Sequence, residues 1–100
     1  MQKRAIMITA GDSVATVVTD VVQGDEVMVK SDAGEFKVIS HHTIPFGHKI
    51  ALRNVEKGGP VIKYGESIGK ATKNIEIGDY VHVHNVESGR GRGDLEVKLA

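Results

Sequence analysis

Two histidines stand at alternate positions in the segment Val81-His82-Val83-His84-Asn85. Side chains at alternate positions of an extended strand share one face, so the segment predicts that His82 and His84 project together. A neutral imidazole binds transition metals, and an imidazole titrates near neutrality, so the pair suits either a metal site or general acid–base catalysis. The residues alone do not separate these two roles. The plain alternative is a pair of hydrogen-bonded surface histidines without chemistry.

Further side chains of the same kind lie upstream. His48 and Lys49, in a Gly-His-Lys triplet, add a third imidazole that could converge on the pair and an ammonium group. Lys63 and Tyr64, which precede a glycine, add a second ammonium and a phenol. The lysines could bind a carboxylate, although a solvated surface lysine is the commoner case, and the glycine would let a ligand approach closely. Asn85 would add an amide at the rim of the site.

Weaker signals complete the candidate set. Arg90 and Arg92, which are separated by a glycine, could clamp a carboxylate from a flexible segment. His41 and His42 are adjacent, so they would face opposite sides of a strand, and we expect them at the surface. The chain contains no phosphate-binding glycine motif and no activated nucleophile. The residues therefore support a patch lined by His, Lys and Asn rather than a complete active site.

The composition bounds the partners. One hundred residues are enough for one domain with a modest core. Thirteen basic and thirteen acidic side chains cancel, so no overall field favours nucleic acid or an anionic membrane. The chain has no cysteine and no apolar run of membrane-spanning length, and its first residues do not resemble a signal peptide. We expect a cytoplasmic protein.

Short Val- and Ile-rich runs separated by Gly and Asp predict an all-β fold with short, bent strands and little helix. The residues from 31 to 34 predict a hairpin turn, and the best helical candidate, residues 19–23, amounts to a single turn. The last residues offer one more short strand at 95–99. The other predicted strands are residues 5–9, 14–18, 26–30, 35–39, 49–52 and 80–84.

An internal pattern recurs three times. In the segments that begin at Val21, Val55 and Ile75, an apolar residue is followed by a glycine three positions later and a valine three positions after that. We expect each segment to form a tight turn that leads into a new strand, with glycine in a conformation that a Cβ disfavours.

Several ordered motifs resemble the N-terminal domain of the altronate dehydratase (altronate hydrolase) family, which includes galactarate dehydratase. The resemblance is dense over residues 46–95 and looser before them. It implies a SAF domain with a β-clip fold, as in type III antifreeze proteins and sialic acid synthase, over residues 1–95, followed by a tail at 96–100. The motifs are Phe46-Gly-His-Lys-Ile-Ala-Leu52, Val61-Ile-Lys-Tyr-Gly65, Ile68-Gly69, Ile75-x-x-Gly78, Val81-His-Val-His-Asn85, Glu87-Ser88 and Arg90-Gly-Arg-Gly-Asp-Leu95.

The resemblance also implies a function. Members of the family dehydrate sugar acids such as altronate and galactarate, commonly with a divalent metal that is typically iron. The larger catalytic domain usual in the family is missing here, so the resemblance implies either a small hydro-lyase subunit or an excised N-terminal domain. In both cases we expect a separate large catalytic part to complete the activity and to supply most of the metal site. Within this set, His48, His82 and His84 would be catalytic or metal-binding residues. The substrate-binding residues would be Lys49, Lys63, Tyr64, Asn85, Arg90 and Arg92.

Two other interpretations stay open beside the dehydratase. The chain could be the alpha subunit of a sulfolactate sulfo-lyase, a small relative that acts with a different leaving group. It could also be a SAF module that binds a sugar acid without catalysis. The histidine motifs favour the two enzymes, because a packing module would not need them. A homo-oligomer is compatible with every interpretation.

Overall fold

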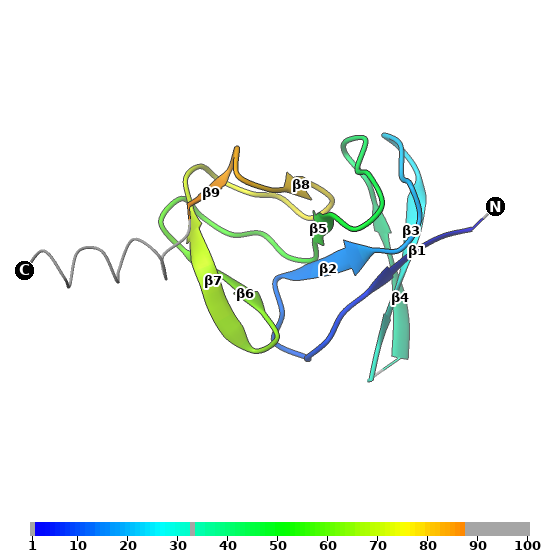
Figure 1. The fold of residues 1–100 in the computed structure, drawn as a ribbon, viewed down its shortest axis with the longest axis horizontal. Helices are drawn as coiled ribbons and strands as arrows, with labels where there is room; N and C mark the ends of the chain where they lie inside the picture. Colours follow the sequence, from blue (N-terminus) through cyan, green and yellow to red (C-terminus); the bar gives the residue numbers. More distant parts are fainter. Residues whose placement is uncertain (1, 33, 88–100) are drawn as a thin grey trace, which may run out of the picture.

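The computed structural model describes residues 2–32 and 34–87, and these residues form nine strands in two sheets without a helix (Figure 1). The predicted all-β fold is therefore confirmed. No helix in the described part of the chain is long and apolar enough to cross a membrane. The strands are β1 (Lys3–Ile6), β2 (Val14–Val17), β3 (Glu26–Ser31), β4 (Gly34–Ile39), β5 (Lys49–Ala51), β6 (Pro60–Lys63), β7 (Glu66–Ala71), β8 (Tyr80–Val81) and β9 (Val86–Glu87).

The larger sheet has the strand order β4-β3-β1-β2-β5-β8, and the smaller sheet has the order β6-β7-β9. Strands β1 and β3 pair in parallel, and the other pairs are antiparallel. The hairpin predicted around residues 31–34 joins β3 to β4, where Ser31 pairs with Gly34. Neighbours in each sheet are often distant in sequence, so residues from the middle and the end of the chain meet.

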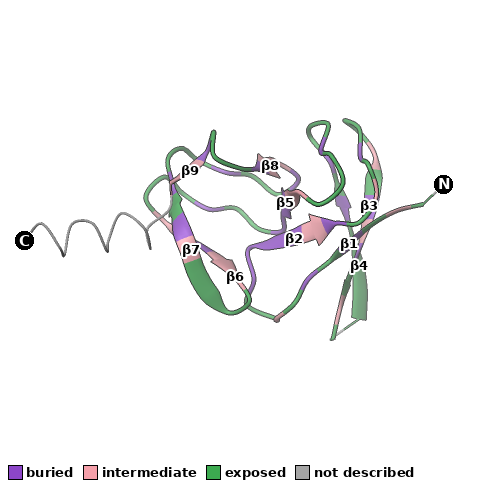
Figure 2. Cartoon of the chain, in the orientation of Figure 1, coloured by how far each residue is buried: buried purple, intermediate pink, exposed green. Residues whose placement is uncertain are grey.

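Two apolar cores lie on opposite sides of β2 and β5. Most residues of these two strands are buried (Figure 2). In β5, Ile50 belongs to one core and the adjacent Ala51 to the other. In β2, Val14 and Ala15 divide in the same way. Successive side chains of a strand point to opposite faces, so these two strands are buried on both sides. β8 pairs with β5, so this doubly buried pair of strands fixes its position.

The repeated turn is confirmed, and the structure shows a fourth copy that begins at Ile44. The glycines of the four turns have φ angles between 89° and 97°, the left-handed region that glycine occupies readily. The apolar residues three positions before and after each glycine are all buried. Isolated bridges pair Val21 with Ile44, and Val55 with Ile75. The turns therefore anchor the core as well as reversing the chain.

The predicted strands differ from the observed ones in three places. The first strand occupies Lys3–Ile6 instead of residues 5–9, β8 ends at Val81 instead of residue 84, and β6, β7 and β9 were not among the predicted strands. The residues of β7 lack a clear alternation of apolar and polar types, which explains why the pattern misses this strand. The strand predicted at 95–99 lies outside the described residues.

The β6–β7 hairpin is closed by Tyr64 and Gly65, both with positive φ (56° and 76°), as a two-residue turn of type I′ requires. The buried carboxylate of Asp12 accepts hydrogen bonds from the Gly65 amide (3.0 Å), the Thr9 amide (3.1 Å) and the Thr9 hydroxyl. Asp12 thus ties the smaller sheet to the loop between β1 and β2.

Candidate functional site

Four side chains form a histidine–tyrosine cluster, which consists of His48, Tyr80, His82 and His84. The Tyr80 hydroxyl lies 2.8 Å from His48 Nδ1, within hydrogen-bonding distance. The His48 and His82 rings meet edge to face with centroids 4.9 Å apart. Tyr80 stacks nearly parallel to His82 at 5.8 Å and meets the His84 ring at 5.4 Å. The phenol of Tyr80 is the common neighbour of the three imidazoles.

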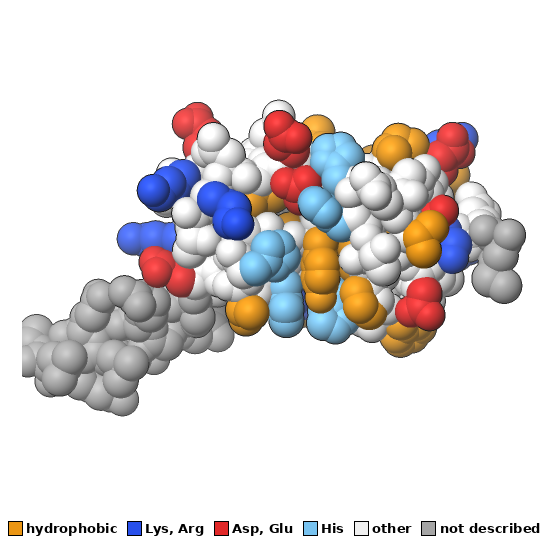
Figure 3. Space-filling view, turned by 90° about the horizontal axis from the view of Figure 1, so that it is seen from above, with side chains coloured by type: hydrophobic (Ala, Val, Ile, Leu, Met, Phe, Trp, Pro, Cys, Tyr) orange, Lys and Arg blue, Asp and Glu red, His pale blue; other side chains and the backbone are white. Residues whose placement is uncertain are grey.

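The pairing of β5 with β8 explains this convergence. Lys49 pairs with Val81, and Ile50 with Tyr80, so His48, just before β5, comes level with His82, just after β8. Histidine side chains gather on this face of the molecule, with acidic groups beside them (Figure 3). The structure thus brings His48 to the pair that lies 34 residues later in the sequence.

The predicted strand through His84 is wrong. The chain leaves the sheet after Val81 and turns over residues 82–85, closed by hydrogen bonds from the Asn85 and Val86 amides to the His82 carbonyl, both 3.1 Å. His82 and His84 are therefore presented by a turn and not by a shared strand face. Both remain exposed, and they flank the ring of Tyr80.

The predicted position of Asn85 at the rim is also wrong. Its side chain is buried, with 4% of its surface exposed. The side-chain oxygen accepts from the His82 amide (3.0 Å), and the side-chain nitrogen donates to the Tyr80 carbonyl (2.8 Å). Short polar side chains that bond nearby backbone in this way compete with the sheet ladder. Asn85 stabilises the turn that carries His82 and His84, and both polar atoms of its side chain bond the backbone there.

A pocket of about 250 Å³ lies beside the cluster, between the edges of the two sheets. Lys49 and His82 supply its polar lining, and the remaining walls are apolar. A small apolar pocket with a few convergent polar groups is typical of a ligand site. The apolar lining residues are Ile68, Val81, Val83 and Val86.

Lys49 is half-buried, and its pKa lies below the ordinary value because of burial and the nearby positive charge of Lys63. The Lys63 ammonium lies 4.7 Å from the centroid of the Tyr64 ring, close enough for a cation–π contact. The positive charge of Lys63 is therefore close enough to act on Lys49. Tyr64 itself is 57% exposed at the hairpin tip. Arg90 and Arg92 lie outside the described residues.

His84 has a pKa below its ordinary value, because of partial burial first and then the charges of Lys73, His82 and His42. A lowered pKa leaves the imidazole neutral at neutral pH, the form that accepts a proton or binds a metal.

Tyr80 is the residue of this site that the sequence pattern did not single out. In the sequence it stands only as the first residue of the predicted strand 80–84 and as one of four aromatic residues. The usable signal was its spacing, because Tyr80, His82 and His84 occupy alternate positions. No local pattern, however, shows that its hydroxyl meets His48.

The three predicted metal ligands do not form a compact donor set in the structure. No choice of one nitrogen from each of His48, His82 and His84 brings all three within 4.8 Å of one another, and His48 Nδ1 already faces the Tyr80 phenol. As placed, the trio does not fit a shared ion, and its metal role stays a prediction. Among the described residues, the group that does meet this distance is His41, Glu76 and Asp79.

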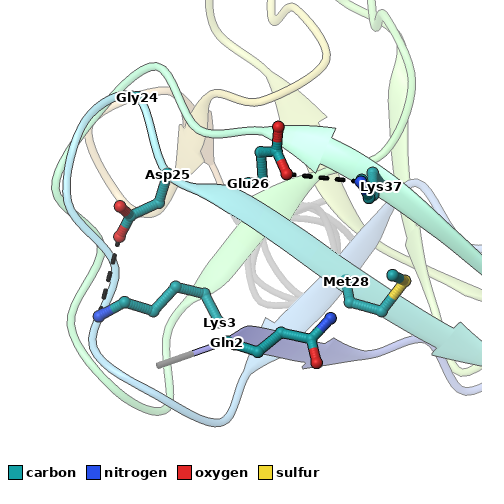
Figure 4. A pocket seen from close by; sticks show the side chains of 7 residues that line it. All are labelled: Gln2, Lys3, Gly24, Asp25, Glu26, Met28 and Lys37. Carbon is teal, nitrogen blue, oxygen red and sulfur yellow. Dashed lines mark ion pairs between the residues drawn. The ribbon is translucent and has the colours of Figure 1, made fainter.

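A larger cavity, of about 370 Å³, lies elsewhere, around the first residues of β1 and β3 (Figure 4). Its charges are paired, Lys3 with Asp25 at 3.8 Å and Lys37 with Glu26 at 3.5 Å. It shares no lining residue with the histidine–tyrosine cluster. Because its charges neutralise each other at the surface, it offers less chemistry than the smaller pocket beside Lys49.

The fold agrees with the comparisons to known proteins. Residues 3–89 match the family described as the altronate/galactarate dehydratase SAF domain. The chain belongs to this family, and the resemblance inferred from its motifs is confirmed.

Two kinds of relative match with different coverage. The (2R)-sulfolactate sulfo-lyase subunit alpha of Paracoccus pantotrophus is 43% identical over 63 residues, which are 63% of this chain and 94% of that subunit. The subunit of the same name from Chromohalobacter salexigens is 37% identical over 86 residues, 81% of this chain and 89% of that subunit. Altronate dehydratase of Escherichia coli is 40% identical over 83 residues, 83% of this chain but 16% of that enzyme.

Proposed function

We propose that this chain is the alpha-type subunit of a two-subunit lyase that eliminates a leaving group from a 2-hydroxy acid, with a sulfolactate-type acid as its substrate. The observation that supports this proposal is the share of each relative's length that the chain matches. It matches 94% and 89% of the two sulfo-lyase alpha subunits and only 16% of the dehydratase. This support favours the sulfo-lyase alternative over the sugar-acid dehydratase that the motifs first suggested. The 40% identity to altronate dehydratase keeps the dehydratase as the second candidate.

Both reactions share one chemical plan. A base removes the proton from the carbon that carries the hydroxyl and the carboxylate, and the group on the next carbon departs with the bonding electrons. Sulfite leaves from sulfolactate, and hydroxide leaves from a sugar acid. The resulting enol becomes a 2-oxo acid. The plan requires an unprotonated base, an acid for the leaving group and cations for the anionic ends of the substrate.

The site offers groups of each kind. The lowered pKa of His84 favours the unprotonated imidazole, which is the form that accepts a proton, and its side chain is exposed. The His48–Tyr80 contact at 2.8 Å can pass a proton between imidazole and phenol. Lys49, with Lys63 nearby, places positive charge at the pocket that His82 also lines. We assign proton transfer to the histidine–tyrosine cluster and recognition of the acid groups to the two lysines.

The histidine cluster is open to solvent, so the proposed partner subunit would have to close the site. Exclusion of water strengthens the electrostatic interactions that such an elimination needs. We assign the catalytic metal implied by the resemblance mainly to that partner, because His48, His82 and His84 do not form a donor set. The chain alone is expected to be inactive.

The test is purification of the tagged chain with its partner from the native host, followed by assays with (2R)-sulfolactate, altronate and galactarate. Formation of sulfite and a 2-oxo acid from sulfolactate by the complex, and not by the chain alone, is the expected result. Dehydration of altronate or galactarate instead would establish the second candidate. Turnover by the chain alone would overturn the subunit proposal.

The role of the histidines is tested in the same complex. His82→Ala combined with His84→Ala should lower kcat strongly while leaving the fold intact, because both side chains are exposed and outside the cores. Lys37→Gln, on β4 and paired with Glu26, is the matched surface control. Full activity of the double variant would reduce the domain to a scaffold or binding module.

A further inference from the structure

A second group of side chains with metal-binding chemistry lies outside the lyase site. His41 and His42 follow the end of β4, and Glu76 and Asp79 come from the turn that precedes β8. His41 Nδ1 lies 2.9 Å and His42 Nε2 3.4 Å from the same oxygen, Asp79 Oδ1. His41, Glu76 and Asp79 each have one potential ligand atom, and these three atoms lie within 4.8 Å of one another. Imidazoles and carboxylates thus converge from two segments that are more than 30 residues apart.

The spacing of these atoms suits a small divalent ion. Ligand atoms at about 2.1 Å from a tetrahedral zinc ion lie about 3.4 Å from one another. The separation of 2.9 Å between His41 Nδ1 and Asp79 Oδ1 comes close to this value, and the chosen Glu76 oxygen lies within 4.8 Å of both atoms. A mixture of imidazole nitrogen and carboxylate oxygen favours zinc and its transition-metal neighbours over calcium or magnesium.

The backbone already holds the two segments in register. The other oxygen of Asp79 accepts from the Glu76 amide at 2.9 Å, which leaves Oδ1 directed toward the imidazoles. The His41 amide donates to the Gly78 carbonyl at 2.9 Å. The positions of His41 and Asp79 are therefore set by contacts that an ion would not disturb. The proton of His41 Nδ1 would move to the outward Nε2 when an ion takes its place.

We propose that His41, Glu76 and Asp79 bind a zinc-type divalent ion that links the end of β4 to the turn before β8. The ion has a structural role, because it joins two surface segments that flank β4 and β8 of the larger sheet. It binds the folded chain and not the separated segments, so it raises stability as its free concentration rises. This site does not depend on the proposed lyase function.

The test uses the full chain with zinc chloride as the probe, followed by isothermal titration calorimetry and by thermal unfolding after removal of metal with EDTA. We expect one ion per chain and a Tm that rises with zinc concentration. His41→Ala and Glu76→Gln should each weaken binding by at least about tenfold. Both side chains are exposed, so their Tm values without metal should match that of the unmodified chain and show that the fold is kept.

His82→Ala is the matched control, because it removes an exposed histidine from the other cluster and leaves the proposed ligands intact. It should bind zinc like the unmodified chain. Loss of binding in His82→Ala but not in His41→Ala would place the ion at the histidine–tyrosine cluster and overturn the proposal. Equal affinity in all three variants, or no binding below millimolar zinc, would overturn it as well.

Discussion

At the scale of single residues, Tyr80 connects the histidines to one another. Its hydroxyl contacts His48 at 2.8 Å, and its ring contacts His82 and His84. Tyr80→Phe keeps these ring contacts and removes the hydroxyl. In the lyase complex, kcat should fall by about 100-fold or more, the usual effect of losing a proton-transfer group, with little change in KM.

The control for this substitution is Phe36→Leu, an exposed aromatic change on β4, which should leave the kinetics unchanged. Thermal unfolding should show that Tyr80→Phe costs at most about 1 kcal/mol, since one hydrogen bond is lost. An unchanged kcat would show that the phenol only packs against the imidazoles.

The titration of His84 is a second prediction at this scale. Burial, followed by the charges of Lys73, His82 and His42, lowers its pKa, so its NMR titration midpoint should lie below about 6.5. Lys73→Gln removes one of these charges and should raise the midpoint. Lys37→Gln, whose charge lies elsewhere and is paired with Glu26, should not. A midpoint above 6.5 in the unmodified chain would contradict the proposed neutral base.

The same lowered pKa affects stability. Unfolded His84 binds a proton more readily than folded His84, so its contribution to the free energy of unfolding is complete above about pH 6.5. The contribution decreases as the pH falls from that value through the lower pKa of the folded state.

At the scale of elements, the alternation of valine and histidine after Tyr80 predicts a strand, and the chain forms a turn instead. The decisive residue is Asn85, whose amide bonds the His82 amide and the Tyr80 carbonyl. The sequence shows that an asparagine is present, but it does not show that its side chain bonds the backbone of His82 and Tyr80. Those backbone groups come within reach only when the chain forms the turn. The three histidines were therefore predictable as site candidates from the sequence. The turn that carries His82 and His84 was not.

Asn85→Ala tests this account of the turn. It would leave two backbone groups without their partner, at a cost of about 1–3 kcal/mol in the free energy of unfolding. Asn85→Asp keeps the oxygen that accepts from His82 and loses the donor to Tyr80, so it should be intermediate in denaturant unfolding. Stability equal to that of the unmodified chain in Asn85→Ala would show that the backbone hydrogen bonds close the turn alone.

The repeated turns allow a matched comparison of two glycines. Gly24 and Gly78 have similar φ angles, 91° and 97°. A Cβ on Gly24 would meet nothing within 4 Å, whereas one on Gly78 would come within 2.2 Å of the Ile39 carbonyl oxygen. Gly24→Ala should cost about 1–2 kcal/mol from backbone strain alone. Gly78→Ala should cost a further 1–3 kcal/mol or so, because the end of β4 must move.

Denaturant unfolding of both alanine variants measures this difference. Equal losses of stability would mean that the backbone near Ile39 yields freely. Such a result would also weaken the argument that the end of β4 and the turn before β8 are held in register.

At the scale of the whole molecule, the sequence predicted the class of fold and the turns but not the order of the strands. Val and Ile runs between Gly turns determine that strands form. The position of β1 between β2 and β3, and the separation of two cores by β2 and β5, depend on contacts between distant residues. His48 was predictable as a candidate, but its contact with Tyr80 requires the pairing of β5 with β8.

Asp12 connects the β6–β7 hairpin of the smaller sheet to the loop between β1 and β2. The same hydrogen bonds determine the direction in which its pKa shifts. Burial alone would raise the pKa, but hydrogen bonds from the Thr9 hydroxyl and from the backbone amides of Gly65, Thr9 and Tyr64 outweigh burial and lower it. The stabilisation is therefore present above the unfolded pKa of about 3.9 and is lost as the pH falls through the folded value.

Asp12→Asn should reduce the free energy of unfolding at pH 7 by about 1–3 kcal/mol, since the charged acceptor of several hydrogen bonds is replaced. It should also flatten the loss of stability below pH 4. Urea unfolding at pH 7 and at pH 3 measures both effects, with Asp32→Asn in the exposed β3–β4 turn as the control. A variant with unchanged stability at both values would show that Asp12 does not hold the hairpin.

The pairing of β5 with β8 also determines the order in which the site can be assembled. His48 and Lys49 enter the growing chain long before Tyr80 and His82, and the strand that brings the later pair into place is among the last of those described. Pairing between distant segments is slow, because the intervening loop must close first. A ribosome-bound chain that ends before residue 80 would therefore carry half of the site on an unfinished sheet, with the edge of β5 exposed to unintended pairing.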